Sequence, residues 1–324
     1  MNFLPDSLKR VLLRANLCIG ALERRDIVSY RDKIRLLSPR YGKEIRFEQE
    51  GNDRIGALIE KGDPLMICRL GSVELGCLRF YLEKRVTGKR SYSDRVRSGM
   101  SNNAGFFPVD DGSLDAFCRA YLEHLKNVDL MAVWFNRYED VLCNRHAGGA
   151  ELIDLTCLEP FHFARPWSGR LAGKKVLVVH PFAESISRQY REKRRLLFAS
   201  PEVLPQFELK TVKAVQSIAG TRVGFASWFD AYRHMCDEMA QVDFDICLIG
   251  AGAYGLPLAS FAKGLGKQAI HMGGVTQILF GIKGRRWEEL YADTTAQLFN
   301  EHWVRPMQAE TPESKDKVEK GCYW

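Results

Sequence analysis

The sequence predicts an α/β fold, in which a parallel sheet is flanked by helices. The clearest observation is a strand–turn–helix–strand pattern over residues 244–274. Two further strand–loop–helix junctions lie over residues 64–84 and 174–198. Because parallel strands are joined through crossover helices, repeated junctions of this kind are typical of a parallel sheet with helices on its faces.

The longest of these units begins with the apolar run 246–249, which fits a buried strand. The glycine-rich turn Gly250–Gly255 follows it, and Pro257 then stands in the first turn of a helix. Proline is tolerated there because the N–H it lacks has no partner within the helix. The helix continues over 258–265, and a second short strand over 268–271 completes the unit.

The turn matches the pattern G-x-G-x-x-G through Gly250, Gly252 and Gly255, with Tyr254 inside it. This pattern brings backbone N–H groups and a helix N-terminus close to an anion, usually a phosphate. A dinucleotide-binding unit also has an acidic residue about 20 positions further on, where this chain has His271. The turn therefore favours a phosphate or nucleotide-sugar ligand over a nicotinamide. A tight turn that only packs a helix on a sheet remains the alternative.

The junction nearer the N-terminus places polar residues at the end of a strand over 65–70. Arg69 ends the strand, Gly71 forms the turn, Ser72 is the expected N-cap, and Glu74 lies in the first helical turn. Ligands of open α/β sheets bind at this carboxyl edge. A cation and a carboxylate beside free helix N–H groups can hold a phosphate and a metal, or accept a proton from a hydroxyl. The alternative is an Arg–Glu pair that only stabilises the turn.

The third junction is a strand over 174–179 that ends at His180, before a strongly basic helix over 184–198. A histidine at this position lies at the usual ligand edge, so His180 is a candidate site residue, and a satisfied structural histidine is the alternative. After the second strand of the glycine-rich unit, we expect Gln277 to close over the ligand. His271 would line the same pocket.

The connections between these units differ in character. We expect a polar functional loop over 90–111, where Asn102 and Asn103 supply amide hydrogen bonds. The segment 137–162 carries His, Asp and Glu residues without a diagnostic ligand spacing, so we interpret it as a solvated connection. The remaining expected elements are helices over 113–125 and 228–239 and strands over 130–135 and 207–212.

Composition sets broad limits on function. The 324-residue chain has a net charge of +7, which favours anionic partners, but it contains no nucleic-acid-binding motif, so we expect no nucleic-acid partner. Nine cysteines without a C-x-x-C spacing indicate reduced thiols and a cytoplasmic protein. No apolar run reaches the roughly 18 residues that a membrane span needs.

We divide the chain into a helical N-terminal extension (1–60), an α/β nucleotide-sugar-binding catalytic domain (61–308) and a C-terminal tail (309–324). The first helix of the extension is basic and amphipathic over 8–19. Such a helix either contacts the inner face of a membrane peripherally or packs on the main domain.

The segment Arg69-Leu70-Gly71-Ser72-Val73-Glu74 resembles the Arg-Phe-Gly-Asp-Gly-Glu motif of the GT-D fold glycosyltransferases. Four other segments resemble a broader GT-D-like group that is often encoded with bacterial surface-polysaccharide genes. They lie at residues 102–108, 180–183, 250–257 and 321–324. The resemblance extends over roughly residues 60 to 324.

This resemblance implies a Rossmann-like fold that binds a nucleotide-sugar donor and transfers the sugar to a hydroxyl of a glycan or lipid-linked acceptor. The family's D-x-E motif holds a divalent cation, Mn²⁺ or Mg²⁺, against the donor diphosphate. Carried over, that role falls on Ser72 and Glu74, and Ser72 replaces the aspartate. A serine hydroxyl is a weak ligand beside a carboxylate. Either Glu74 and the phosphates bind the metal, or Arg69 and helix N–H groups replace it.

The sequence thus predicts a cytoplasmic glycosyltransferase of surface-polysaccharide biosynthesis. Arg69 and the turn Gly250–Gly255 would hold phosphates, Glu74 would bind metal or act as base, and His180 and His271 would line the sugar or acceptor pocket. Catalysis would come mainly from electrostatic stabilisation of the departing diphosphate. Two alternatives are a non-catalytic subunit of a polysaccharide assembly complex and an NAD(P)-dependent oxidoreductase.

Overall fold

The computed structural model describes residues 29–88, 91–289, 291–318 and 321–324. Within them, eight strands form one sheet in the order β1-β4-β3-β2-β8-β7-β5-β6, and every adjacent pair is parallel. The strands are β1 (Ile45–Arg46), β2 (Leu65–Arg69), β3 (Leu130–Val133), β4 (Glu151–Asp154), β5 (Lys175–His180), β6 (Glu208–Lys213), β7 (Ile246–Ile249) and β8 (Gln268–His271). The predicted fold class is confirmed.

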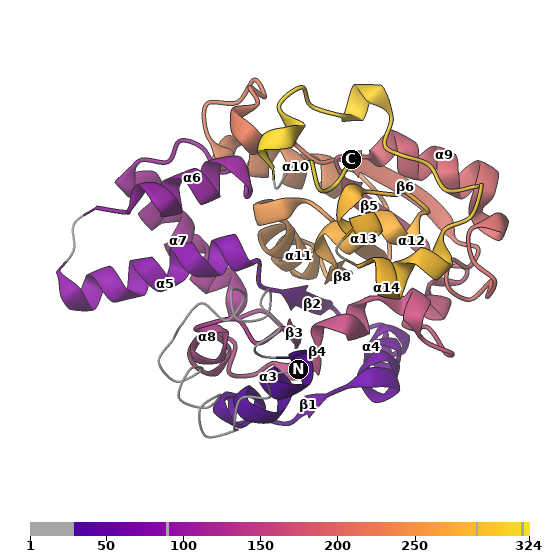
Figure 1. Cartoon of the computed structure of the whole chain (residues 1–324), viewed down its shortest axis with the longest axis horizontal. Coiled ribbons are helices and arrows are strands. Elements are labelled where there is room, and N and C mark those ends of the chain that lie inside the picture. Colours follow the sequence, from indigo (N-terminus) through magenta and orange to yellow (C-terminus); the bar gives the residue numbers. More distant parts are fainter. Residues whose placement is uncertain (1–28, 89–90, 290, 319–320) are drawn as a thin grey trace.

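Helices cover both faces of the sheet (Figure 1). The described helices are α3 (Tyr30–Leu37), α4 (Glu48–Lys61), α5 (Ser72–Thr87), α6 (Asp94–Asn102), α7 (Asp111–Leu125), α8 (Glu139–His146), α9 (Ala183–Lys193), α10 (Trp228–Ala240), α11 (Gly255–Gly264), α12 (Thr276–Leu279), α13 (Arg285–Glu289) and α14 (Ala292–Thr295). One core packs α5, α7, α10 and α11 on one face, and a second packs α4, α9 and α12 on the other. Successive residues of β2 alternate between the two cores, because side chains alternate across a strand.

The topology fixes where a ligand can bind. The chain leaves β2 towards α5 on one face, and it leaves β8 towards α12 on the other. The neighbouring strands β7 and β5 diverge in the same way, towards α11 and α9. A crevice forms at the carboxyl ends of adjacent strands whose connections separate like this. Arg69, His271, Gly250 and His180 lie at the ends of these four strands.

The predicted strands are present, with shifts at their ends. Both strands of the glycine-rich unit have the expected bounds, and Pro257 is the third residue of α11. The other predicted strands differ from expectation by one residue or two at an end. Strands β1 and β4 were not predicted, and β4 lies in the segment 137–162, so the interpretation of that segment as a solvated connection is wrong there.

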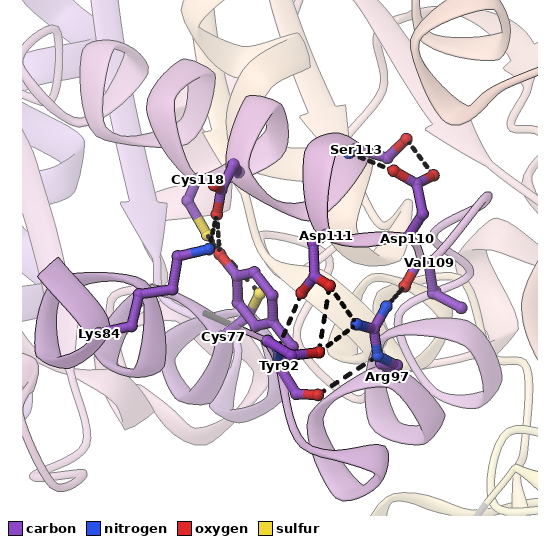
Figure 2. Close-up of polar contacts among 11 residues, drawn as sticks. Cys77, Lys84, Tyr92, Arg97, Val109, Asp110, Asp111, Ser113 and Cys118 are labelled. Atoms are coloured by element: carbon purple, nitrogen blue, oxygen red, sulfur yellow. Dashed lines mark hydrogen bonds and ion pairs between the residues drawn. The ribbon is translucent and has the colours of Figure 1, made fainter. Parts of the chain in front are cut away.

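The predicted polar loop over 90–111 is wrong in part, because α6 occupies its centre. Arg97 on this helix forms an ion pair with Asp111 at 2.8 Å and donates to the backbone carbonyl of Tyr92 (Figure 2). Tyr92 in turn donates its N–H to Asp111 and its hydroxyl to Asp115, at 2.8 and 2.7 Å. These contacts bind α6 to the start of α7, so Arg97 has a structural role here.

The C-terminal tail docks on the sheet domain. Trp324 is buried, and its ring centroid lies 6.1 Å from that of Phe182. The buried carboxylate of Glu310 accepts hydrogen bonds from the N–H groups of Glu184 and Ser185, at 2.8 and 3.3 Å, and from the Ser185 hydroxyl. The tail therefore supplies an acceptor for the N-terminal N–H groups of α9.

The predicted amphipathic helix over 8–19 lies outside the described residues. The described part of the N-terminal extension is mainly helical, but its strand β1 pairs with β4 in the common sheet. None of the helices in the described ranges has the length and apolar character that crossing a bilayer requires.

We predict that Glu310→Gln destabilises the protein by about 1–2 kcal/mol, because a charged acceptor at a helix N-terminus is replaced by a neutral one. Urea unfolding of the full chain measures the difference. Glu313→Gln, three residues further along the tail and exposed, is the matched control and should leave stability unchanged. Equal stability of both variants would show that the tail does not anchor α9.

Candidate active site at the carboxyl edge

Arg69 occupies the end of β2, where two contacts orient its guanidinium. Its Nη2 donates to the carbonyl of Leu70 at 3.2 Å, and its Cζ lies 4.9 Å from the ring centroid of Trp134. The Trp134 indole N–H donates to the same carbonyl at 3.0 Å. The Nε of Arg69 is buried and has no hydrogen-bond partner among the described residues. The guanidinium is therefore held over an indole ring, and its Nε donor is unused.

Gly71, Ser72 and Glu74 form the start of α5. Gly71 is the N-cap and Ser72 is the first helical residue, so the prediction that Ser72 is the N-cap is wrong. The Glu74 carboxylate folds back over Gly71, where any Cβ would overlap its oxygens. The absence of a side chain at position 71 is what lets Glu74 cover the helix start. Ser72 remains exposed.

Glu74 is 7% exposed, and its environment changes its acidity. Burial raises its pKa, while a hydrogen bond from its own N–H and the positive charge of Arg69 partly oppose the rise. A carboxylate with a raised pKa binds a proton more readily, which is the property that a general base at neutral pH needs.

The glycine-rich turn packs against both site histidines. A Cβ at Gly250 would lie 2.5 Å from Cδ2 of His180, and one at Gly255 would overlap the ring of His271. Gly252 has a φ of 52°, a region that glycine adopts readily. Gly250 and Gly255 are thus required because a side chain would not fit, and Gly252 is favoured by its backbone conformation.

His180 and His271 are both buried and neutral. Burial lowers the pKa of each to about 3, and the nearby charge of Arg69 also lowers that of His271. Nδ1 of His180 accepts from the Phe182 N–H at 2.9 Å, so its proton is on Nε2. Nδ1 of His271 lies 3.3 Å from the carbonyl of Ile249, which can only accept, so Nδ1 carries the proton there. Nε2 of His180 is therefore a hydrogen-bond donor and Nε2 of His271 an acceptor, and neither ring is charged.

Gly273 connects Arg69 to this turn. A Cβ at Gly273 would lie 2.7 Å from Nη1 of Arg69. The carbonyl oxygen of Gly273 would in turn lie 2.8 Å from a Cβ at Gly250. Arg69, the turn and His180 therefore lie close together at the carboxyl edge. Whether these residues bind a substrate stays a prediction.

Asn102 and Asn103 lie at the end of α6, beside the same turn. The Asn102 amide donates to Ser98 at 3.1 Å. The next residue, Ala104, has its carbonyl 3.8 Å from the position a Gly252 Cβ would take. The structure thus brings the asparagines near the glycine-rich turn, and their contact with a ligand stays a prediction.

Tyr254 and Gln277 both stabilise the protein around the site. The Tyr254 ring stacks on Trp228 with centroids 4.7 Å apart, and its hydroxyl lies 3.1 Å from that of Ser217. The buried Gln277 amide donates to the carbonyls of Ile282, Lys283 and Tyr323 at 3.1 to 3.2 Å. These bonds hold the C-terminal segment beside the site. The expected ligand contacts of both residues stay predictions.

Glu139 is a buried carboxyl beside the candidate site that the sequence interpretation missed. The segment that contains it was expected to be solvated, but Glu139 is fully buried. Its Oε2 accepts from the Tyr41 hydroxyl and from the N–H groups of Trp134 and Asn136, at 2.8 to 3.2 Å. Through Trp134 it positions the indole that carries Arg69. Its place soon after the end of β3 was the available signal, the same one that identified Arg69 and His180.

The residues at this edge supply few ligands for a metal. Glu74 is a single buried carboxylate and Ser72 a neutral hydroxyl. No group of three or more His, Cys, Asp or Glu residues in the described ranges could hold a metal ion. Mg²⁺ at a phosphate site takes one or two carboxylates and completes its coordination with substrate phosphates and water, and this edge supplies one buried carboxylate. We therefore assign no step to a metal, and the predicted Mn²⁺ or Mg²⁺ stays untested.

Comparison with known proteins gives two structural similarities. No protein-family profile and no curated protein matches the chain. A selenomethionine-substituted structure of the domain of unknown function DUF1792 aligns with 87% of this chain and 96% of its own, at 12% identity and a TM-score of 0.42. A glycosyltransferase (DUF1792) from Streptococcus sanguinis aligns with 86% of this chain and 100% of its own, at 11% identity and a TM-score of 0.38. Both TM-scores are below 0.5, so fold and site rest on the topology and side chains described above.

We predict that Gly255→Ala destabilises the protein by about 1–3 kcal/mol, because the new methyl group overlaps the buried ring of His271. Gly264→Ala, at the other end of α11, has nothing within 4 Å and should stabilise by up to about 1 kcal/mol. Thermal unfolding compares the two. Equal effects would show that the third glycine of the motif is not required for packing.

Burial raises the pKa of Glu139 from its ordinary value of 4.5 to about 7. Between these values the unfolded chain has lost the proton that the folded chain retains, so stability falls as pH rises. We predict that Glu139→Gln gains stability relative to wild type by a few kcal/mol from about pH 4.5 to 7 and no further above it. Urea unfolding across this range measures the difference. The exposed Glu44→Gln should follow the wild-type profile, and a parallel profile for Glu139→Gln would contradict the shift.

Proposed function

We propose that the protein is a glycosyltransferase that moves a sugar from a nucleotide-sugar donor to a hydroxyl of a glycan or lipid-linked acceptor. The observation that carries the proposal is the Arg69 guanidinium, held between Trp134 and the Gly273 backbone beside the glycine-rich turn. The resemblance around Arg69–Glu74 and the name of one structural neighbour agree with this class. The same resemblance is the basis for proposing a surface polysaccharide as the product and the cytoplasm as the location.

In this proposal Arg69 and the turn bind the donor diphosphate. A guanidinium is always charged and offers parallel N–H donors that match two phosphate oxygens. The turn Gly250–Gly255 adds backbone N–H groups at the start of α11. Both act most strongly when the diphosphate leaves, because negative charge builds on its bridging oxygen in the transition state.

Glu74 is the proposed general base. The acceptor oxygen forms a bond to the anomeric carbon, and its proton passes to the Glu74 carboxylate. The bond between the anomeric carbon and the phosphate oxygen breaks, and the diphosphate leaves with the electron pair. The raised pKa of Glu74 favours this transfer, since it lies nearer to neutrality than that of an exposed carboxylate.

The two neutral histidines are proposed to contact the sugar or the acceptor. Nε2 of His180 is a donor and Nε2 of His271 is an acceptor, given the hydrogen bonds made by their Nδ1 atoms. Sugar hydroxyls both donate and accept, so one nitrogen of each kind suits them. With its pKa lowered to about 3, His180 orients hydroxyls rather than supplying a proton.

We predict that one nucleoside diphosphate or its sugar raises the melting temperature of the wild-type protein, and that EDTA does not remove the shift. Ligand at 100 times its Kd adds about 2.7 kcal/mol of stability. Arg69→Ala should abolish the shift, whereas Arg69→Lys should retain part of it because the charge remains. Glu74→Gln should bind the donor but lose about 10²–10⁴-fold in turnover. Glu83→Gln, on the same helix and partly exposed, should behave as wild type.

The other outcomes discriminate between functions. A shift with NAD(P) alone would overturn the transferase proposal and favour an oxidoreductase. Donor binding without sugar transfer to any glycan or lipid-linked acceptor would favour a binding subunit of an assembly complex. A shift that EDTA removes would show that a metal, and not Arg69 alone, neutralises the diphosphate.

A further inference from the structure

A cavity of about 980 Å³ lies at the edge of the sheet opposite to the candidate active site. Three segments line it: part of α4, residues 165–172 and residues 194–206. They lead into the amino ends of β2, β5 and β6, respectively. Arg69 and His180 lie at the carboxyl ends, so the cavity is separate from that site.

Two buried residues that line the cavity have unpaired polar atoms. Asn52 on α4 is 0% exposed, and neither its Oδ1 nor its Nδ2 has a hydrogen-bond partner among the described residues. Trp167 is 1% exposed, and its indole Nε1 is also unpaired. Buried polar groups are nearly always hydrogen-bonded, because an unpaired one destabilises the folded state. Among the described residues, one acceptor (Asn52 Oδ1) and two donors (Asn52 Nδ2 and Trp167 Nε1) beside this cavity therefore have no hydrogen-bond partner.

Arginines surround the cavity. Arg165 and Arg170 form ion pairs with Asp53 and Glu60 across it, at 2.7 and 3.0 Å. Arg195 is exposed and forms no ion pair with the described residues. The lining holds four arginines (Arg165, Arg170, Arg194, Arg195) and three acids (Asp53, Glu60, Glu202), which leaves one net positive charge.

Size, charge and chemistry together select a ligand class. The volume is at the upper end of the roughly 300–1,000 Å³ typical of ligand sites. Because the lining arginines come from two separate segments, 165–172 and 194–206, they suit carboxylates spaced along a chain better than one compact diphosphate. Amide, indole N–H and guanidinium groups bind hydroxyls and carboxylates alike. The half-buried ring of Phe198 adds an apolar surface for a sugar face.

We propose that this cavity is a second binding site, which holds an acidic oligosaccharide. The proposal goes beyond sugar transfer at the carboxyl edge, and it rests on the proposed function only for the presence of a glycan. A site of this kind keeps a growing acidic chain attached to the protein while its end is extended at the opposite edge.

Calorimetric titration of the full-length protein with tetragalacturonate, and with maltotetraose as the neutral control, tests the proposal. We expect tetragalacturonate to bind and maltotetraose to bind at least about tenfold more weakly. Arg195→Glu should weaken tetragalacturonate binding about tenfold or more. Arg191→Glu, the same change on exposed α9 next to its ion-pair partner Glu192, should not alter it.

Asn52→Leu separates binding from folding. Because the Asn52 amide has no partner, an apolar side chain of similar size should leave the melting temperature unchanged or higher, yet abolish tetragalacturonate binding. No tetragalacturonate binding to the wild-type protein would overturn the proposal, as would equal binding of both sugars or binding that survives both Arg195→Glu and Asn52→Leu. Arg69→Ala should lose donor binding but retain tetragalacturonate binding, so failure at one edge is distinguishable from failure at the other.

Discussion

The close contact between the Arg69 guanidinium and the backbone of Gly273 determines the geometry of the carboxyl edge. A side chain at Gly273 would displace the guanidinium, since its Cβ would lie 2.7 Å from Nη1. The Gly273 carbonyl in turn leaves no room for a side chain at Gly250. The strand ends of β2, β8 and β7 thus approach too closely to admit a side chain at Gly273 or Gly250. The cation at the end of β2 and the glycine-rich turn after β7 therefore lie close together.

The rest of the site supports that cation. Glu139 accepts from the backbone of Trp134, and Trp134 carries Arg69 on its indole. This arrangement requires a buried carboxyl whose pKa burial raises to about 7, which costs stability at neutral pH. Arg69 also helps to keep His271 neutral by lowering its pKa. Buried groups whose pKa values are strongly shifted at a loss of stability are typical of functional sites.

Much of the fold could be predicted because the sequence carries it locally. The run of apolar residues in β7, the turn Gly250–Gly255 and Pro257 define the βαβ unit, with both strands at the expected bounds and the helix starting three residues earlier than expected. Arg69 and His180 could be identified because each lies at the end of a predicted strand, and parallel strands end at one edge of the sheet.

The helix α6 was missed because its sequence is polar, and Arg97 and Asp111 stabilise it through contacts that the local sequence pattern does not reveal. Glu139 was missed because its burial depends on Tyr41, 98 positions away. The cavity at Asn52 is likewise formed by three segments distant in sequence, so no local motif marks it.

The central claim is that the carboxyl edge binds a donor diphosphate through Arg69 and the glycine-rich turn. A crystal structure of the protein grown with the nucleoside diphosphate that binds best, in the presence of EDTA, tests it most directly. We predict phosphate oxygens within hydrogen-bond distance of the Arg69 guanidinium and of the backbone N–H groups at Gly250–Gly255. A diphosphate bound elsewhere, or one seen only with a metal ion between it and Glu74, would contradict it.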